Sequence, residues 1–355
     1  MATPGPGDHG MTSRSWAAAL CGYYGFGNFG DELLAEALVR GMEECGVPRE
    51  RLVILSAAPE RSARDLGVAS VDRWSFREVW GALKRSETLL LGGGGLFQDV
   101  TSLRSVLYYA GVVHLARMAG CRPWAFGQSV GPLKSWIGRA LARRSLGRCA
   151  FRGVRDAPSE ALLRRWEMEC RRSPDGAFLL ADEGNPSPAE TGKDLLVNLR
   201  PWGGSLSRDC AKIAAVEASR RRLSLVGVAL APEDEGVLED LRRDGVFPCT
   251  RVVTLTDLVQ ARELFGGAAM AVGMRLHFLV ISAVMRRPAV AVPYDPKVES
   301  FARDWSFPVW YGEGPLPEPG GAEKDPGDAR QEVKAALESA WLASSQEARR
   351  REVEA

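Results

Sequence analysis

The sequence has no long hydrophobic run, almost no net charge and no cysteine pattern. None of its apolar stretches reaches the ~18 residues that suggest a membrane span. A formal charge of +1, from 46 basic and 45 acidic residues, provides no global field for holding nucleic acid. The seven cysteines are scattered without a C-x-x-C pair, which argues against a disulfide framework or a zinc site and favours the reducing cytoplasm. We therefore expect a cytoplasmic protein without a metal site, in which any anion binding is local.

Apolar residues, by contrast, are plentiful. At 355 residues and 45% hydrophobic content, the chain is long enough for two buried cores. Short apolar runs alternate with helical patterns, which is typical of βαβ units around parallel sheets. The expected strands of the first sheet are Trp16–Cys21, Leu52–Leu55, Thr88–Leu91, Pro123–Phe126 and Cys149–Val154. Those of the second are Leu195–Leu199, Leu223–Ala229, Val252–Leu255, Ala269–Gly273 and Ala289–Val292.

Polar and Pro/Gly-rich stretches divide the chain into domains. Residues 1–14 are expected to form a disordered leader, and residues 182–193 a boundary between the domains. The expected parts are an N-terminal Rossmann-like domain (15–185), a C-terminal Rossmann-like domain (190–311), a linker (312–328) and a C-terminal helix (329–355). Two facing domains of this kind with parallel sheets and a returning helix predict an α/β fold of the GT-B type.

Arg275-Leu276-His277 follows the expected strand Ala269–Gly273, and Lys297 follows the next strand. Parallel strands joined by a right-handed crossover open their carboxyl ends on one edge of the sheet. Two cations and an imidazole can therefore converge there on an anion. The alternative for His277 is a core histidine with satisfied hydrogen bonds. Arg200, at the end of the first strand of this domain, is a further candidate for binding a carboxylate or phosphate.

Three loops of the first domain are rich in glycine and polar residues. The first, from Gly22 to Asp31, contains G-x-G-x-x-G, but the acidic residue expected after the second strand of a dinucleotide-binding domain is missing. A tight turn, or a loop that holds an anion or a sugar oxygen through Asn28 and Asp31, is favoured over a nicotinamide site. The others follow the third and fourth strands, and their candidate ligand contacts are Gly94, Gln98, Asp99, Thr101 and Gln128. Asp99 can deprotonate a hydroxyl.

Two basic features have both a functional and a structural interpretation. Arg155, beside Asp156, can reach the cleft or form an internal ion pair. The stretch from Lys134 to Arg152 alternates arginines with Trp136, Ile137 and other apolar residues. It is either a solvated helix face or a surface for an anionic membrane or a lipid diphosphate.

Taken together, these motifs resemble the polysaccharide pyruvyl transferase family, in particular the CsaB type of bacterial cell-wall enzymes. The resemblance extends in order over most of the chain. The strings that carry it are Gly22–Asp31, Gly93–Asp99, Thr101–Ser105, Tyr108-Tyr109, Gly127-Gln128, Gly131-Pro132, Val154–Asp156, Gly273–His277 and Tyr294–Val298. One departure is the segment Val228–Glu235, where the family often has Pro-Met-x-x-x-x-Asp.

The resemblance implies a GT-B-like fold and transfer of pyruvate from phosphoenolpyruvate onto a sugar as a cyclic ketal. It places Arg275, Leu276 and His277 at the phosphoenolpyruvate site and links Lys297 and Arg155 to activity. It also implies a lipid-linked acceptor ending in β-N-acetylmannosamine, a 4,6-ketal, and a polymer that S-layer proteins bind. The enzyme would use phosphoenolpyruvate as co-substrate without another cofactor, in the cytoplasm and at times against the membrane.

The expected chemistry begins with protonation of the phosphoenolpyruvate methylene. Arg275, Lys297, Arg200 and Arg155 would hold the donor anion, and His277 would act as acid or base. Asp99 or Asp31 would orient or deprotonate the acceptor. Two alternatives stay open from the residues: a GT-B glycosyltransferase that uses a nucleotide sugar, and a non-catalytic carbohydrate- or nucleotide-binding protein.

Overall fold

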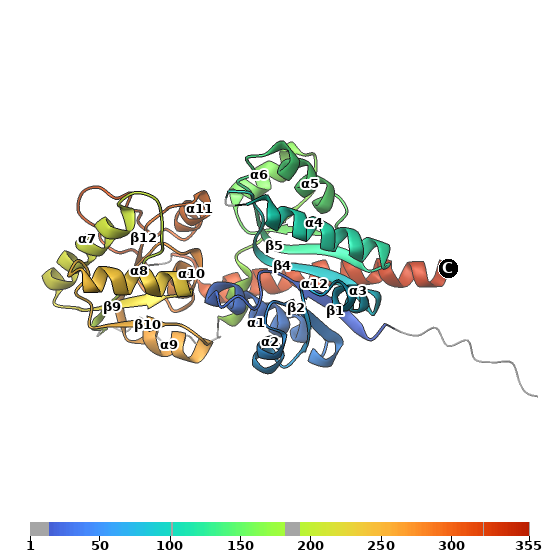
Figure 1. Cartoon of the computed structure of the whole chain (residues 1–355), viewed down its shortest axis with the longest axis horizontal. Coiled ribbons are helices and arrows are strands. Elements are labelled where there is room, and N and C mark those ends of the chain that lie inside the picture. The colour runs from blue at the N-terminus through green and yellow to red at the C-terminus, as the bar shows by residue number, and fades with distance from the viewer. Residues whose placement is uncertain (1–13, 101, 182–191, 322, 355) are drawn as a thin grey trace, which may run out of the picture.

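The computed structural model describes residues 14–100, 102–181, 192–321 and 323–354. The chain forms two α/β lobes that lie side by side (Figure 1). No helix in the described part of the chain is long and apolar enough to cross a membrane. Arg14, which we expected in the disordered leader, is held by the carbonyl oxygens of Ser86 and Ala119.

The first lobe is a seven-stranded parallel sheet in the order β3-β2-β1-β4-β5-β6-β7. Its strands are β1 (Trp16–Cys21), β2 (Leu52–Ser56), β3 (Ala69–Asp72), β4 (Ser86–Phe97), β5 (Arg122–Val130), β6 (Arg152–Val154) and β7 (Arg171–Arg172). Its helices are α1 (Phe29–Glu44), α2 (Pro59–Leu66), α3 (Phe76–Lys84), α4 (Leu103–Met118), α5 (Trp136–Leu146) and α6 (Ala157–Arg165), with short 3₁₀ turns η1 (Arg49–Arg51) and η2 (Gly176–Leu180).

The second lobe is a five-stranded parallel sheet in the order β10-β9-β8-β11-β12. Its strands are β8 (Asp194–Asn198), β9 (Ser224–Ala229), β10 (Arg251–Thr254), β11 (Ala268–Gly273) and β12 (Ala289–Ala291). Its helices are α7 (Leu206–Arg221), α8 (Pro232–Arg243), α9 (Leu258–Gly266), α10 (Leu276–Val284) and α11 (Pro296–Asp304).

Both sheets reverse their strand order at one point, between β1 and β4 in the first lobe and between β8 and β11 in the second. In open parallel sheets the loops that leave the carboxyl ends of such a strand pair diverge and leave room for a ligand. The loop after β1 ends at Asn28 and leads into the first turn of α1, which contains Asp31, and the loop after β11 contains Arg275. The topology therefore brings the two predicted halves of the site to the reversal points.

The two strands expected to end at Leu91 and Phe126 are longer than predicted. β4 continues through the glycines to Phe97, and β5 continues to Val130. The two strands pair along this extension, where Gly94 lies opposite Gln128, so the glycine run is strand and not turn. Gly93 and Gly94 have φ of 59° and 83°, which only glycine adopts easily, and the ladder shifts register beyond them.

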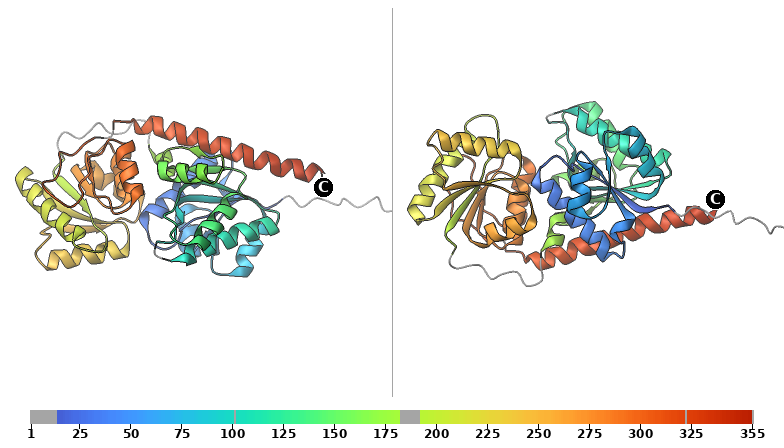
Figure 2. Two further views of the ribbon diagram at one scale, coloured as in Figure 1. Left: turned by 90° about the horizontal axis from the view of Figure 1, so that it is seen from above. Right: turned by 60° about the horizontal axis from the view of Figure 1, so that its bottom comes forward.

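The chain returns to the first lobe in one long helix, α12 (Pro326–Glu354). It begins three residues earlier than expected, within the proposed linker. Another part of this linker pairs with the second sheet, where Gly320 lies opposite Ala289 of β12. Figure 2 shows α12 running along the first lobe in both views. Val333, Ala336, Leu337 and Ala340 are buried there, and the helix packs on β4, β5 and η2. Residues 182–191 of the expected domain boundary lie outside the described residues.

Candidate active site

The loops at the two reversal points touch across the boundary between the lobes. The backbone N–H of Phe29, which begins α1, donates to the carbonyl oxygen of Leu230 after β9 at 2.7 Å. Asn28, a predicted ligand contact, caps α1 by accepting from the N–H of Gly30 at 3.2 Å. The first turn of α1 thus lies against the second lobe, with Asp31 two residues from this contact.

His277 reaches across the boundary from the first turn of α10 and packs on Gly30. A Cβ atom at Gly30 would lie 2.2 Å from Nδ1 of His277, so a side chain at this position would displace the imidazole. The other ring nitrogen, Nε2, lies 3.4 Å from Nη1 of Arg155. Because a guanidinium can only donate, Nε2 accepts and the proton of the neutral ring is on Nδ1.

Arg155 lies at the centre of a buried network between the lobes. Its Nη1 donates to Asp175 at 2.5 Å and its Nε donates to the hydroxyl of Ser129 at 2.8 Å. The side chains of Arg155 and Asp175 are 4% and 2% exposed. Ser129 in turn donates to Asp156, so Arg155 is linked to Asp156 through a hydroxyl, and its internal ion pair is with Asp175.

Burial sets the protonation of His277 and Asp31 in opposite directions. It lowers the pKa of His277 to about 4, even though the nearby Asp175 carboxylate acts the other way. It raises the pKa of Asp31 to about 7, against the attraction of Arg155. The Asp31 side chain makes no hydrogen bond to another residue of the described chain. At neutral pH the site therefore contains an uncharged imidazole and a carboxyl group that is close to half-protonated.

Arg275 is not the free cation that the sequence suggested. Asp234 accepts from its Nε and Nη2 at 2.6 and 2.7 Å, and Glu233 accepts from Nη2 at 2.7 Å. Although burial opposes it, hydrogen bonding to Asp234 raises the pKa of Arg275. Both carboxylates come from the segment that departs from the family pattern. Only Nη1 makes no hydrogen bond within the described residues, so this nitrogen alone is available to an anion.

Lys297 is the least constrained of the predicted cations. Its side chain is 28% exposed, and its Nζ lies 3.6 Å from Asp295, the residue that caps α11. Arg200 is held by the second lobe: Nη1 donates to the hydroxyl of Tyr294 at 2.7 Å, and the guanidinium lies 4.4 Å from the centre of that ring. Lys297 can therefore reorient toward a ligand, whereas Arg200 is fixed in place.

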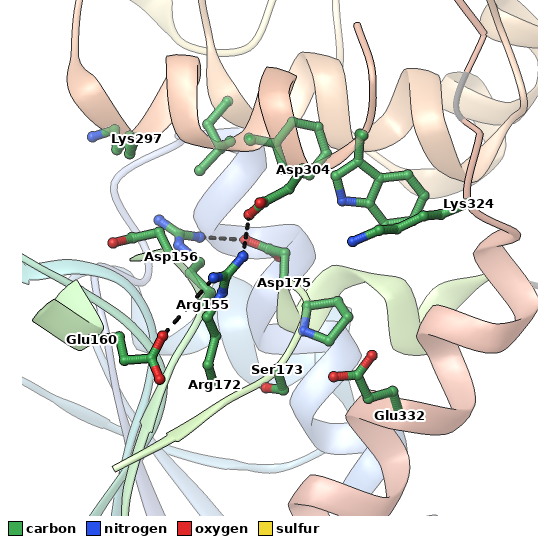
Figure 3. A pocket seen from close by; sticks show the side chains of 14 residues that line it. Arg155, Asp156, Glu160, Arg172, Ser173, Asp175, Lys297, Asp304, Lys324 and Glu332 are labelled. Atoms are coloured by element: carbon green, nitrogen blue, oxygen red, sulfur yellow. Dashed lines mark hydrogen bonds and ion pairs between the residues drawn. The ribbon is translucent and has the colours of Figure 1, made fainter. Parts of the chain in front are cut away.

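Two cavities open at the boundary between the lobes and share Lys297 and Asp156 as lining residues. One of them is drawn in Figure 3, where Arg155 and Asp175 join each other and Arg172 joins Asp304. Lys297 lies at its rim, and Leu276, the residue between Arg275 and His277, also lines it. Arg275, His277 and Asp31 line neither of these cavities, and all three are largely buried.

Two predicted acceptor contacts have structural roles instead. Both oxygens of Asp99 are occupied, because it accepts from the N–H groups of Lys134 and Ser135 and from the Ser135 hydroxyl ahead of α5. Partial burial opposes these hydrogen bonds, but they lower the pKa of Asp99, so it is a poor base. Gln128 is fully buried within β5 and donates to the carbonyl oxygen of Leu91, so it does not reach the surface.

The other predicted acceptor contacts differ in their position. Gly94 lies next to Asp31, since a Cβ atom there would be 3.2 Å from an Asp31 oxygen. The Gln98 side chain accepts from the N–H of Val100 and is partly buried. Thr101 lies outside the described residues. Asp31 and Gly94 are therefore the two acceptor candidates that the fold brings together with His277.

The G-x-G-x-x-G loop does not present free amides to a phosphate. The N–H groups of Gly25 and Gly27 both donate to Glu32, at 2.9 and 3.4 Å. In a dinucleotide-binding loop these groups would point at the ligand. The loop is therefore closed by its own glutamate, which favours the tight-turn interpretation over a nicotinamide site.

Sequence reasoning missed the carboxylates that hold the basic residues. Asp175 is 20 residues from Arg155, and Asp234 is 41 residues from Arg275. The only local signal for Asp175 is the Ser-Pro-Asp-Gly turn around it. Among the described residues, no group of three or more His, Cys, Asp or Glu side chains could hold a metal ion.

The basic stretch forms α5 and the turn before it. Trp136 and Ile137 are 73% and 39% exposed at its start. Arg143 and Arg144 are exposed farther along, and neither forms an ion pair within the described chain. The helix thus presents apolar and cationic side chains on the first lobe.

Solved structures similar to this chain support the same architecture. A glycosyltransferase from Rickettsia africae is 10% identical with a TM-score of 0.52, and the alignment covers 96% of this chain and 97% of that one. A putative UDP-N-acetylglucosamine 2-epimerase from Listeria monocytogenes is 9% identical with a TM-score of 0.56, and the alignment covers 93% of this chain and 91% of that one. A UDP-GlcNAc 2-epimerase from Methanocaldococcus jannaschii is 9% identical with a TM-score of 0.55. This alignment covers 90% of this chain and 98% of that one. At this identity they confirm the GT-B-like fold and nothing finer.

No curated protein sequence is significantly similar to the chain. The sequence model of polysaccharide pyruvyl transferases, however, matches residues 28–296, which is well over half of the chain. The match extends from Asn28, the N-cap of α1, to Pro296, the first residue of α11. It begins after β1, and it contains the reversal point of the second lobe and the network around Arg155 and His277. The chain therefore belongs to the polysaccharide pyruvyl transferase family.

Proposed function

We propose that this enzyme transfers pyruvate from phosphoenolpyruvate to a sugar of a cell-wall polysaccharide precursor, as a ketal across two hydroxyls. The observation that carries the proposal is the convergence of His277, Arg155 and Asp31 at the boundary between the lobes, with Lys297 at its rim. Phosphoenolpyruvate has a carboxylate and a phosphate close to one reacting carbon. It therefore needs several fixed donors around a group that can carry a proton.

The donor would be held by nitrogen atoms that the protein leaves unoccupied. Arg275 Nη1 and Arg155 Nη2 make no hydrogen bond within the described residues, and Lys297 is free to turn. The internal carboxylates keep both guanidinium groups oriented. In this proposal Arg200 contributes charge from its fixed position beside Tyr294.

The reaction would then proceed by addition and displacement. A proton is added to the methylene carbon of phosphoenolpyruvate, and the central carbon becomes oxocarbenium-like. One sugar hydroxyl attacks this carbon and loses its proton. The second hydroxyl then displaces inorganic phosphate and closes the ketal, so that one donor and one diol give one ketal and one phosphate.

Asp31 is the better proton donor of the two candidate groups. The imidazole, with a pKa of about 4, is uncharged at neutral pH, and its Nε2 is already an acceptor. The Asp31 carboxyl, with a pKa of about 7, retains its proton in part of the molecules. A catalytic acid works best with a pKa near the working pH.

The finer identity of the acceptor follows from the resemblance to CsaB-type enzymes. We infer a 4,6-ketal on a β-N-acetylmannosamine of a lipid-linked precursor made on the cytoplasmic side, with a product that S-layer proteins bind. The segment that holds Glu233 and Asp234 differs from the family pattern and lies beside the donor site. It is therefore where the acceptor or donor contacts of this enzyme would diverge.

The decisive experiment is mass spectrometry of a β-N-acetylmannosaminyl glycoside after incubation with phosphoenolpyruvate. We expect the acceptor to gain the mass of pyruvate less one water, with release of one phosphate, and to do so in EDTA as well. Protection against thermal unfolding by a UDP-sugar but not by phosphoenolpyruvate would instead favour a GT-B glycosyltransferase. No mass gain with any N-acetylhexosamine acceptor would overturn the proposal.

The exposed face of α5 would bring the enzyme to a lipid-linked acceptor. We expect it to sediment with phosphatidylglycerol vesicles, less so at high salt, and weakly with phosphatidylcholine vesicles. Replacing Arg143 and Arg144 by alanine should lower the partition coefficient more than tenfold, because each cation contributes ~1 kcal/mol at an anionic surface. The same change at Arg242 and Arg243 of α8 is the matched control. Equal losses in the two variants would contradict this placement.

A further inference from the structure

Four aromatic side chains gather beside the loop between β1 and α1, which leads to Asp31. Tyr23 and Phe26 belong to this loop, Trp74 follows β3, and Tyr108 lies on α4. Tyr23 and Phe26 stack with centres 4.1 Å apart, Phe26 meets Trp74 at 6.3 Å, and Trp74 meets Tyr108 at 5.5 Å. These four residues form a continuous set of rings, which we call the aromatic shelf.

The buried side chain of Arg73 packs against the aromatic shelf and holds its rings in place. It is only 4% exposed, and its guanidinium carbon lies 5.0, 5.3 and 4.3 Å from the ring centres of Phe26, Trp74 and Tyr108. Its Nη1 donates to the carbonyl oxygen of Gly22 at 2.7 Å, which ties the rings to the loop after β1. Within the described residues it forms no ion pair, so the ring faces supply the negative potential that it needs.

The outer side of the aromatic shelf is open to water. Trp74 is 63% exposed and Tyr23 is 43% exposed, although each packs against other rings. Isolated exposed aromatics are common, but a contiguous set whose positions are fixed by a buried cation is typical of a binding surface. Tyr108 also packs against the core of the first lobe, whereas Tyr23 and Trp74 contact other rings of the aromatic shelf.

The aromatic shelf adjoins the candidate active site. Tyr23 is eight residues before Asp31 in the same loop and first helical turn, at the carboxyl end of β1. After partial burial, the charges of Asp31 and Glu233 contribute most to raising the pKa of the Tyr23 phenol. One end of the shelf is therefore close to groups of both lobes that surround the proposed donor site.

We propose that the aromatic shelf is a carbohydrate subsite, on which sugar rings of the acceptor glycan stack against Trp74 and Tyr23. The inference rests on the proposed function and adds a place for its second substrate. Pyranose rings have apolar C–H faces and a rim of hydroxyls, which suits flat rings with the phenol groups of Tyr23 and Tyr108 beside them. Neither Asp99 nor Gln128 is free for this task, so the shelf replaces them as the acceptor contact.

The test compares Trp74→Ala, Trp74→Phe and Trp136→Ala with the wild-type enzyme. The acceptor is the methyl glycoside of a disaccharide that ends in β-N-acetylmannosamine. We expect Trp74→Ala to raise the KM for this acceptor about tenfold, with the KM for phosphoenolpyruvate and kcat little changed. Trp74→Phe should recover most of the loss. Trp136, an exposed tryptophan on α5 outside the aromatic shelf, should be neutral with this lipid-free acceptor.

A direct binding measurement separates this inference from the reaction itself. Saturation-transfer NMR of the same disaccharide, without phosphoenolpyruvate, should give signals with the wild type that are lost in Trp74→Ala. If the wild type binds the disaccharide but makes no ketal, the proposed reaction fails and the subsite stands. If ketal forms and Trp74→Ala leaves the acceptor KM unchanged, the subsite is overturned. It is also overturned if binding of the nucleotide UMP depends on Trp74 and binding of the disaccharide does not.

Discussion

Replacing Asp175 by alanine is expected to lower the free energy of unfolding by about 3–5 kcal/mol and to abolish ketal formation. Arg155 would remain buried with its 2.5 Å ion pair removed, and the acceptor that orients its guanidinium toward His277 would be gone. A buried cation without its partner costs far more than the pair contributes. Urea denaturation of the wild type and the variant measures the loss.

Two further variants make this result specific. Asp240 pairs with Arg243 at 3.0 Å on the surface of α8, with exposures of 70% and 75%, so Asp240→Ala should cost under about 1 kcal/mol. The double change Arg155→Met and Asp175→Leu removes both charges and should regain most of the stability while remaining inactive. A loss for Asp175→Ala as small as that for Asp240→Ala would contradict the role of this pair.

Asp31→Asn is expected to reduce the rate of phosphate release by about 10²- to 10⁴-fold. The asparagine has nearly the same shape but has no proton to give to the donor. With the pKa of Asp31 at about 7, the wild-type rate should fall as the pH rises above neutrality, because the carboxyl group ionises. This alkaline decrease should disappear from the residual activity of Asp31→Asn and remain in the slower His277→Gln.

Stability supplies an independent measure of the same group. Burial raises the pKa of Asp31 from 3.8 to about 7, so the folded state binds its proton more tightly than the unfolded state does. The cost of ionising it in the fold therefore grows between about pH 4 and 7 and is complete above that range. The melting temperature of Asp31→Asn relative to the wild type should rise over the same range. Equal melting temperature differences at pH 5 and 8 would contradict the assignment.

Variants of Asp31 and His277 also distinguish an enzyme from a protein that only binds carbohydrate. If His277→Ala stops turnover and leaves the melting temperature unchanged, a non-catalytic carbohydrate-binding role is excluded. If Asp31→Asn keeps full activity and its alkaline decrease while His277→Gln stops turnover, the proton comes from the imidazole after all. A donor trianion in the site would then have raised the pKa of His277.

The central strands were predictable because parallel strands covered on both faces are short runs of apolar residues. β1 has the expected bounds, Trp16–Cys21, and the strands of the second lobe differ from the prediction by about a residue. The two strands at the edges of the first sheet were missed. β3 (Ala69–Asp72) is only partly covered, and β7 consists of two arginines, so neither has an apolar run to recognise.

The candidate site was predictable in position but only partly in its contacts. Strand order places the ends of β1 and β11 at the reversal points, close to Asp31 and Arg275, whereas Arg155 and Lys297 follow β6 and β12. Which cation remains free, however, depends on contacts between distant residues. Glu233 and Asp234 occupy Arg275, and Ser135 occupies Asp99, because the folded chain brings them within hydrogen-bonding distance. No local spacing encodes such pairs.

The long last helix has a consequence for the order in which the protein can be made. Val333, Ala336 and Leu337 of α12 fill the same core as Leu38, Met42 and Trp124 of the first lobe. The ribosome therefore releases the first lobe with part of its apolar interior still uncovered while the second lobe is being synthesised. The half of the enzyme that is translated first would be the last to be completed, and its surface under α12 is where a nascent chain would need protection from aggregation.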